Sequence, residues 1–309
     1  LQIADKNLPE LHEQIITPDI SCSVLNKGDE IVIDLGNHYV GYFSFMLNYV
    51  DMYIDAPVKL CVRFCETRRE LDDDYSTYSG ELCESWLQEE TIIVDFPELY
   101  KFTRRYAARY VKITVLATPK KLMLSEFKFR AVSSADVKQL KKCDCNYELK
   151  KIDSVAVNTL KNCMHRVFED GPKRDRRLWI GDLRLEALTN YYTFNNLSLV
   201  RRCLYLFAAA DTNAKGFIPG YVYENPKFVS GYCFLEDYAL FFVASACDYY
   251  NYTEDRDTFC ELYPVIKKQM DAMYNTLDVD GIVTVKDGCD ANISRGKALE
   301  KITSMQGAY

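Results

Sequence analysis

The sequence predicts a two-part fold: an N-terminal β-sandwich of the jelly-roll kind, followed by a helical domain built from repeated hairpins. From Asp29 to Val132, apolar and polar side chains alternate over many short runs with turn residues between them, which is typical of antiparallel strands. After Ser134 the apolar residues recur at helical spacing instead. A chain of 309 residues can bury two full cores. We therefore expect a β-sandwich accessory domain over 1–134 and a helical domain over 135–309.

The strand candidates of the first domain share short length, near-strict alternation and flanking turn residues. They are Glu30–Leu35, Val40–Val50, Pro57–Cys65, Thr91–Phe96, Arg109–Leu116 and Leu122–Phe129. The clearest, Pro57–Cys65, places Val58, Leu60, Val62 and Phe64 on one face. A long exposed loop is expected at Glu70–Gly80, where the β pattern breaks.

Three aromatic side chains lie in or near that loop: Tyr75, Tyr78 and Trp86. They could stack on a sugar ring, or they could simply pack against one another within the loop. The sequence leaves both possibilities open, because a sandwich fold alone does not establish carbohydrate binding.

The helix candidates of the second domain share broad apolar stripes, as expected for helices that line or wrap a helical barrel. They are 153–166, 182–192, 197–209, 235–249 and 256–276, with another beginning near Ser294. Asp153 and Asp182 are the expected N-caps of the first two. Five or six helices over this length resemble half of such a barrel, so the chain is expected to be truncated.

Composition excludes several classes of protein. The net charge of −7 leaves no basic surplus to neutralise phosphates, so no nucleic-acid partner is expected. No apolar run approaches the roughly 20 residues that span a bilayer, so no membrane partner is expected either. The twelve cysteines are dispersed, which favours reduced, mostly buried thiols in the cytoplasm. Three histidines far apart in sequence predict no metal site, and we expect no cofactor.

The most unusual stretch runs from Glu169 to Asp182. It holds four carboxylates, four basic side chains and one of two tryptophans within fourteen residues. Gly171-Pro172 and Gly181 predict a loop over Asp170–Gly181. Clustered acids and an aromatic side chain on a loop between rigid helices are typical of a catalytic site.

This stretch resembles the signature of the α-L-rhamnosidases of glycoside hydrolase family 78, in which Asp-x-Pro-x-Arg-(Glu/Asp) precedes Trp-x-Gly-Asp. The resemblance continues in Ser85-Trp-Leu-Gln-Glu-Glu90, in Ala131-Val-Ser-Ser-Ala-Asp136 and in Glu224-Asn-Pro-Lys227. It implies β-sandwich domains before an (α/α)6 six-hairpin barrel, of which this chain would hold the first part. It also implies release of terminal α-L-rhamnose from an oligosaccharide or other glycoside, with inversion of configuration.

Such inversion needs an acid that protonates the leaving oxygen and a carboxylate that activates water. By motif position, the resemblance makes Asp175 the general acid, where many members carry Glu. It also implies that Asp170, Arg174, Trp179 and Asp182 bind the sugar. For the acid role to hold, we predict that Arg176 and Arg177 point away from Asp175.

Outside the motif, Asp237 is a further candidate sugar contact, with Glu224 and Glu236 nearby in sequence. His165 is expected to touch main-chain carbonyls at a helix end. No position matches the family's general base, a distal glutamate. The alternatives are a six-hairpin glycosidase with another sugar specificity and a non-catalytic carbohydrate-binding protein.

Overall fold

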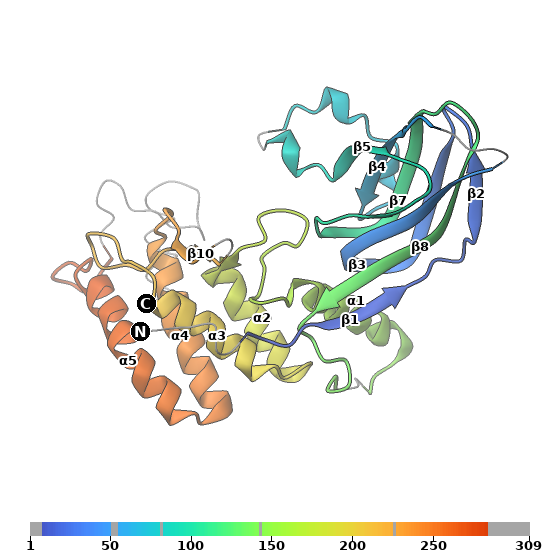
Figure 1. Ribbon diagram of the computed structural model, residues 1–309. Helices are drawn as coiled ribbons and strands as arrows, with labels where there is room; N and C mark the ends of the chain where they lie inside the picture. Colours follow the sequence, from blue (N-terminus) through green and yellow to red (C-terminus); the bar gives the residue numbers. More distant parts are fainter. Residues whose placement is uncertain (1–7, 51–54, 81–82, 142–143, 225–226, 284–309) are drawn as a thin grey trace. The chain divides into compact units, whose positions relative to one another are not determined.

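The computed structural model describes residues 8–50, 55–80, 83–141, 144–224 and 227–283. They form two compact units. The β-rich unit comprises His12–Ser133 together with Pro172–Arg174, and the helical unit comprises the other described residues. The predicted order, β before α, is confirmed (Figure 1).

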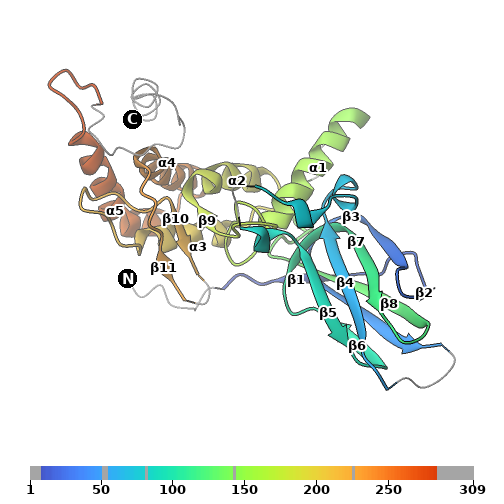
Figure 2. The same ribbon diagram turned by 90° about the horizontal axis from the view of Figure 1, so that it is seen from above.

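The strands of the β-rich unit pair antiparallel throughout, in the order β1-β8-β3-β7-β4-β5, with β2 also on β8 and β6 also on β3 (Figure 2). Their bounds are β1 His12–Ile16, β2 Cys22–Leu25, β3 Glu30–Tyr49, β4 Val58–Cys65, β5 Glu89–Val94, β6 Glu98–Lys101, β7 Tyr106–Ala117 and β8 Leu122–Ser133.

The two strands predicted over 30–50 are one long strand, β3. Its register against β7 shifts between Asp34 and Tyr39, where Gly36 has a φ of 80°. A glycine adopts that conformation without strain, so the chain passes the irregularity without leaving the sheet. The sequence analysis missed β1, β2 and β6, whose four or five residues are too short for a clear period.

The core of the β-rich unit follows the alternation of the strands. The four residues predicted to face inward on β4 are all fully buried. Phe43 of β3 lies near the centre, with its ring 5.9 Å from Phe64 and 6.2 Å from Phe102 between centroids. Edge and tilted ring packing of this kind adds to the burial of apolar area.

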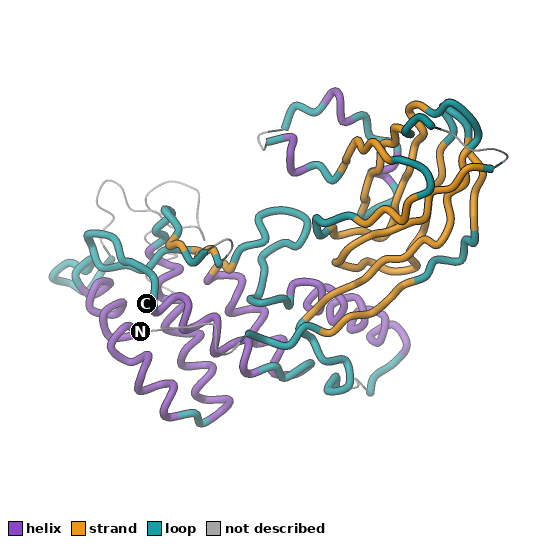
Figure 3. The backbone as a smooth tube through the Cα atoms, viewed as in Figure 1, coloured by secondary structure: helices purple, strands orange, loops and turns teal. Residues whose placement is uncertain are grey.

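The helices of the helical unit are α1 Tyr147–Cys163, α2 Ile180–Tyr192, α3 Leu197–Ala208, α4 Glu236–Thr253 and α5 Arg256–Tyr274 (purple in Figure 3). A small antiparallel sheet joins β9 Leu178–Trp179, β10 Tyr221–Tyr223 and β11 Val229–Ser230. The helix expected near Ser294 lies outside the described residues.

Both predicted N-caps are wrong. Asn146 caps α1, and its side chain accepts the N–H of Leu149 at 3.0 Å. Asp153 lies inside the helix, because the six residues before it are also helical. Asp182 lies in the first turn of α2, whose N-cap is Trp179.

The predicted state of the cysteines is confirmed only in part. All ten described cysteines are free, but only Cys65 and Cys203 are buried. The others lie half-buried or exposed because the apolar runs around them also supply the outward faces of helices and strands. Within the described ranges, no helix is both long and apolar enough to cross a bilayer.

Candidate active site

The acidic loop closes on itself through main-chain hydrogen bonds. Asp170 donates its N–H to the carbonyl of Arg177 at 3.0 Å, and its Oδ1 accepts the N–H of Arg177 at 3.1 Å. Arg176 donates its N–H to the carbonyl of Gly171 at 3.2 Å. The loop therefore returns to its starting point before β9 begins, which fixes the position of residues 175 and 176.

Asp175 and Arg176 both adopt left-handed backbone conformations, with φ of 59° and 54°. Two consecutive non-glycine residues in this region are uncommon and costly. Such strain persists where the surrounding contacts impose it and is concentrated at functional sites. Asp175, the predicted acid, is half-buried at this bend.

Three of the predicted site carboxylates lie close enough to influence one another electrostatically. Burial, together with the charges of Asp175 and Asp182, raises the pKa of Asp170 to about 7, against the lowering effect of the hydrogen bond from Arg177. Burial and Asp175 also raise the pKa of Asp182. The site therefore holds a carboxyl group with a pKa near neutrality beside other carboxyl groups, an arrangement that acid–base chemistry uses.

Glu186 is a member of this cluster that the sequence analysis missed. Burial raises its pKa well above the usual range, and the charges of Asp182, Asp170 and Glu169 act in the same direction. Its Oε2 is enclosed and has no hydrogen-bond partner among the described residues. Its position four residues after Asp182, on the same face of α2, was the signal that could have identified it.

An aromatic wall, formed by the rings of Trp179, Tyr221 and Tyr238, lies next to the carboxyl groups. The Trp179 indole lies 4.6 Å from the ring of Tyr221 and 6.2 Å from that of Tyr238, between centroids. Its Nε1 is enclosed and unpartnered within the described part of the chain. A buried donor without an acceptor calls for a water or a ligand group. The wall thus offers an apolar face and one hydrogen-bond donor.

The lack of a side chain at Gly181 makes room for the ring of Tyr238 in this wall. A Cβ at Gly181 would lie 2.5 Å from Cζ of Tyr238, far inside van der Waals contact. The Trp-x-Gly-Asp segment therefore places an indole, a close ring contact and a carboxylate within four residues.

The guanidinium group of Arg177 lies against two aromatic rings. Its guanidinium carbon lies 5.0 Å from the ring centroid of Tyr221 and 4.8 Å from that of Tyr223, a favourable cation–π distance.

The remaining predicted site residues are exposed or engaged in local contacts. Arg174 is exposed and belongs to the β-rich unit. Asp237 is fully buried in the first turn of α4, where its Oδ1 accepts the N–H of Tyr238 at 2.9 Å. Glu224 forms an ion pair with Arg202, and Glu236 forms one with Lys215 at 2.9 Å.

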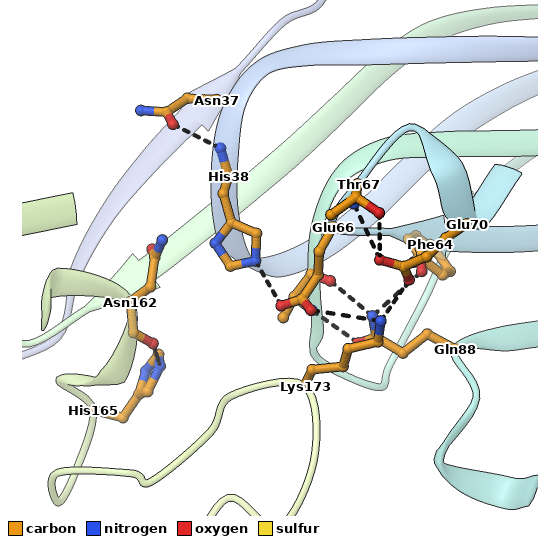
Figure 4. Close-up of polar contacts among 11 residues, drawn as sticks. Asn37, His38, Phe64, Glu66, Thr67, Glu70, Gln88, Asn162, His165 and Lys173 are labelled. Carbon is orange, nitrogen blue, oxygen red and sulfur yellow. Dashed lines mark hydrogen bonds and ion pairs between the residues drawn. The ribbon is translucent and has the colours of Figure 1, made fainter. Parts of the chain in front are cut away.

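Within the β-rich unit, Lys173 is held by two carboxylates (Figure 4). Its Nζ contacts Glu70 at 2.5 Å and Glu66 at 3.5 Å, and His38 contacts Glu66 at 3.0 Å. The Glu70 carboxylate also accepts the N–H and the hydroxyl of Thr67, each at 3.1 Å. This network fixes the position of the Lys173 ammonium group.

His165 serves a structural role, as predicted. Its Nε2 lies 2.9 Å from the carbonyl oxygen of Asn162 near the end of α1, and the side chain is buried (Figure 4). Among the described residues, no group of three or more His, Cys, Asp or Glu side chains is arranged to hold a metal ion.

The helical hairpins and the acidic, aromatic loop match the six-hairpin glycosidase fold. A family model for the bacterial alpha-L-rhamnosidase 6 hairpin glycosidase domain matches residues 140–288. The glycosyl hydrolase family 78 alpha-rhamnosidase N-terminal domain matches residues 11–134. The chain belongs to glycoside hydrolase family 78, the α-L-rhamnosidases.

Solved structures agree with this assignment. The rhamnosidase from Klebsiella oxytoca, solved with rhamnose bound, is 36% identical with a TM-score of 0.89, covering 95% of this chain and 63% of that chain. A family 78 rhamnosidase of Bacillus sp. GL1 is 20% identical with a TM-score of 0.72, covering 95% and 31%. An α-L-rhamnosidase from Dictyoglomus thermophilum is 20% identical with a TM-score of 0.68, covering 97% and 33%.

The chain thus spans less than two thirds of the length of each of these structures. The likeness to the Bacillus and Dictyoglomus structures concerns the fold alone. No curated protein matches the chain.

Proposed function

We propose that the protein hydrolyses terminal α-L-rhamnosides with inversion of configuration, and that Asp175 is the general acid. The observation that carries this proposal is the cluster of Asp170, Asp175, Asp182 and Glu186, whose charges act on one another, beside an indole whose N–H is enclosed and unpartnered among the described residues. It supports acid–base chemistry next to an apolar wall in a chain of the α-L-rhamnosidase family.

In the proposed mechanism, Asp175 donates its proton to the glycosidic oxygen as the bond from that oxygen to the anomeric carbon breaks. A carboxylate on the opposite face of the sugar takes a proton from water as the water attacks. Inverting glycosidases hold these two carboxyl groups roughly 6.5–9.5 Å apart. We assign that second carboxylate to no residue of this sequence, because no position matches the family's general base.

Asp170 and Asp182 bind sugar hydroxyls in this proposal. With a pKa of about 7, Asp170 alternates between donating and accepting a hydrogen bond near neutral pH. Trp179 packs against the C6 methyl group of rhamnose while its N–H donates to a hydroxyl. We propose only weak sugar contacts for Arg174 and Asp237, because Arg174 is exposed and Asp237 already accepts the N–H of Tyr238.

The test is a panel of p-nitrophenyl glycosides assayed with the full-length protein. Turnover of the α-L-rhamnoside well above that of the other sugars supports the proposal. Preferential turnover of a different sugar would replace it with another six-hairpin glycosidase activity. Rhamnose binding without turnover of any substrate would replace it with a carbohydrate-binding role.

We also place the protein in the cytoplasm, because all ten described cysteines are free and disulfides are rare in reducing compartments. Counting alkylated thiols in freshly lysed cells, with and without reductant, tests this. Equal counts support the placement, whereas extra thiols after reduction would contradict it.

A further inference from the structure

Glu186 of α2 carries a carboxyl group to which the proposed chemistry gives no individual task. The residue is half-buried overall, but its Oε2 is enclosed and has no hydrogen-bond partner among the described residues. An enclosed carboxyl group stays ionised only where a cation or several hydrogen-bond donors compensate the loss of water. The groups around Glu186 therefore decide whether it carries a charge or a proton.

The groups around Glu186 are acidic or neutral. Both α1 and α3 pack against α2, and the groups that interact electrostatically with Glu186 lie on these helices and between α1 and α2. They are Cys163 on α1, Glu169 and Asp170 after it, Asp182 on α2 and Cys203 on α3. Arg202, next to Cys203, is positively charged, but it pairs with Glu224. Glu186 therefore keeps its proton at neutral pH.

The thiol of Cys163 orients this carboxyl group. It donates a hydrogen bond to Glu186. Burial, together with the charges of Glu186 and Glu169, raises the pKa of the thiol, so it keeps its own proton and remains a donor. Since Oε2 is the oxygen without a partner among the described residues, the acid proton of Glu186 is placed on Oε2. Glu186 thus offers one O–H donor inside the helical unit.

One acceptor lies on the same face of the helix as that donor. Asp182 precedes Glu186 by four residues on α2, a spacing that brings the Cβ atoms of two helical residues to about 5–6 Å. The charge of Asp182 has the largest electrostatic effect of any neighbour on Glu186. Two polar groups that are close but not in direct hydrogen-bond contact are commonly bridged by one water molecule.

Asp182 requires a donor of this kind for its proposed role. To accept a hydrogen bond from a sugar hydroxyl on either oxygen, its carboxyl group must be ionised. Burial and the charge of Asp175 raise the pKa of Asp182 and so favour the protonated form. A hydrogen bond donated by a neutral acid favours the ionised form instead, and it adds no charge to the site.

We propose that Glu186 is a positioning residue for the sugar-binding site: it remains protonated and donates its Oε2–H, through one water molecule, to the carboxylate of Asp182. The inference rests on the proposed function and adds to it a residue that does not touch the substrate. The bridge keeps the Asp182 carboxylate ionised and in one orientation, so that it can accept a sugar hydroxyl.

The test measures the pH dependence of kcat/KM for p-nitrophenyl α-L-rhamnoside with the full-length protein, because this profile reports the ionisation of essential groups in the free enzyme. Glu186→Met removes the donor and should move the acid limb of the profile upward by about one pH unit, the contribution of roughly one hydrogen bond to a charged group. Glu186→Gln keeps a donor and should leave the limb in place.

Leu188→Ala is the matched control. Leu188 is a half-buried residue of the same helix that packs against the core of the helical unit. Its truncation should lower the melting temperature without moving the acid limb, which separates lost packing from a lost donor. An unmoved limb in Glu186→Met, or equal shifts in the Met and Gln variants, would refute the positioning role.

A second measurement does not depend on activity. The infrared difference spectrum between wild type and Glu186→Gln at neutral pH should contain the C=O stretch of a protonated carboxylic acid, and its absence would overturn the inference. Failure of the unaltered protein to hydrolyse any rhamnoside would instead overturn the proposed function. The role of Glu186 in sugar binding would then fall with it, whereas its protonation would still be decided by the infrared spectrum.

Discussion

Asp170→Asn should make the protein more stable at alkaline pH, because the wild-type carboxylate becomes costly there. Burial and the charges of Asp175 and Asp182 raise the pKa of Asp170 from 3.8 to about 7. A group whose pKa is raised by folding favours the folded state below its unfolded pKa, and this advantage is lost as the pH rises through the folded pKa. Asparagine has the same shape and can still accept the N–H of Arg177.

The magnitude follows from the size of the shift. A change from 3.8 to about 7 is roughly three pH units, which corresponds to about 4 kcal/mol at about 1.36 kcal/mol for each unit. Because the carboxyl is only partly buried, solvent screening reduces this to about 2 kcal/mol. Wild type should therefore lose about 2 kcal/mol between pH 4 and pH 8 that the variant retains.

The assay is urea unfolding of both proteins at several pH values in that window. Asp211→Asn, at an exposed position of the same unit, is the matched control and should follow wild type. If the free energies of unfolding of Asp170→Asn and wild type differ by the same amount at pH 4 and pH 8, the burial and coupling of Asp170 are refuted.

Three further predictions concern the loop and its neighbours. Asp175→Asn should slow hydrolysis of a rhamnosyl disaccharide by about 10²–10⁴-fold. It should slow hydrolysis of p-nitrophenyl rhamnoside much less, because nitrophenolate needs little protonation to leave. Equal losses of rate on the two substrates would argue against the acid role. Lys173→Met removes the ammonium group that contacts Glu70 and Glu66, and should lower the free energy of unfolding in urea by about 1–2 kcal/mol. Lys173→Arg keeps the positive charge and should lower it less. Equal free energies of unfolding for the two variants would show that the pairing is unimportant. Gly181→Ala should destabilise the protein by about 1–3 kcal/mol and so lower its melting temperature, since the new methyl group would lie 2.5 Å from Tyr238. A higher melting temperature for the variant would show that the ring of Tyr238 moves aside at no cost.

The parts of the fold with a clear period could be predicted from the sequence. Strict alternation identified β4, and helical spacing identified α3 and α5 to within a few residues. The short strands β1 and β6 could not be found this way, because neighbouring strands rather than their own pattern hold them in the sheet. Local interactions compete within a few residues at helix ends, so Asn146 rather than Asp153 caps α1.

The candidate site, too, could be predicted from the sequence only in part. The motif identified Asp170 and Asp182, which are part of one electrostatic cluster in the structure. It could not reveal that Oε2 of Glu186 has no hydrogen-bond partner among the described residues, or that the rings of Tyr221 and Tyr238 pack against Trp179. These depend on tertiary packing, which brings distant segments together in a way that spacing along the chain does not encode.

The most direct test of the central claim follows the sugar released from an aryl α-L-rhamnoside by proton NMR in the first minutes of reaction. Inverting hydrolysis predicts that β-L-rhamnose appears first and that the α anomer accumulates only later by mutarotation. Initial release of α-L-rhamnose would contradict the direct attack of water on the anomeric carbon, and with it the inverting mechanism.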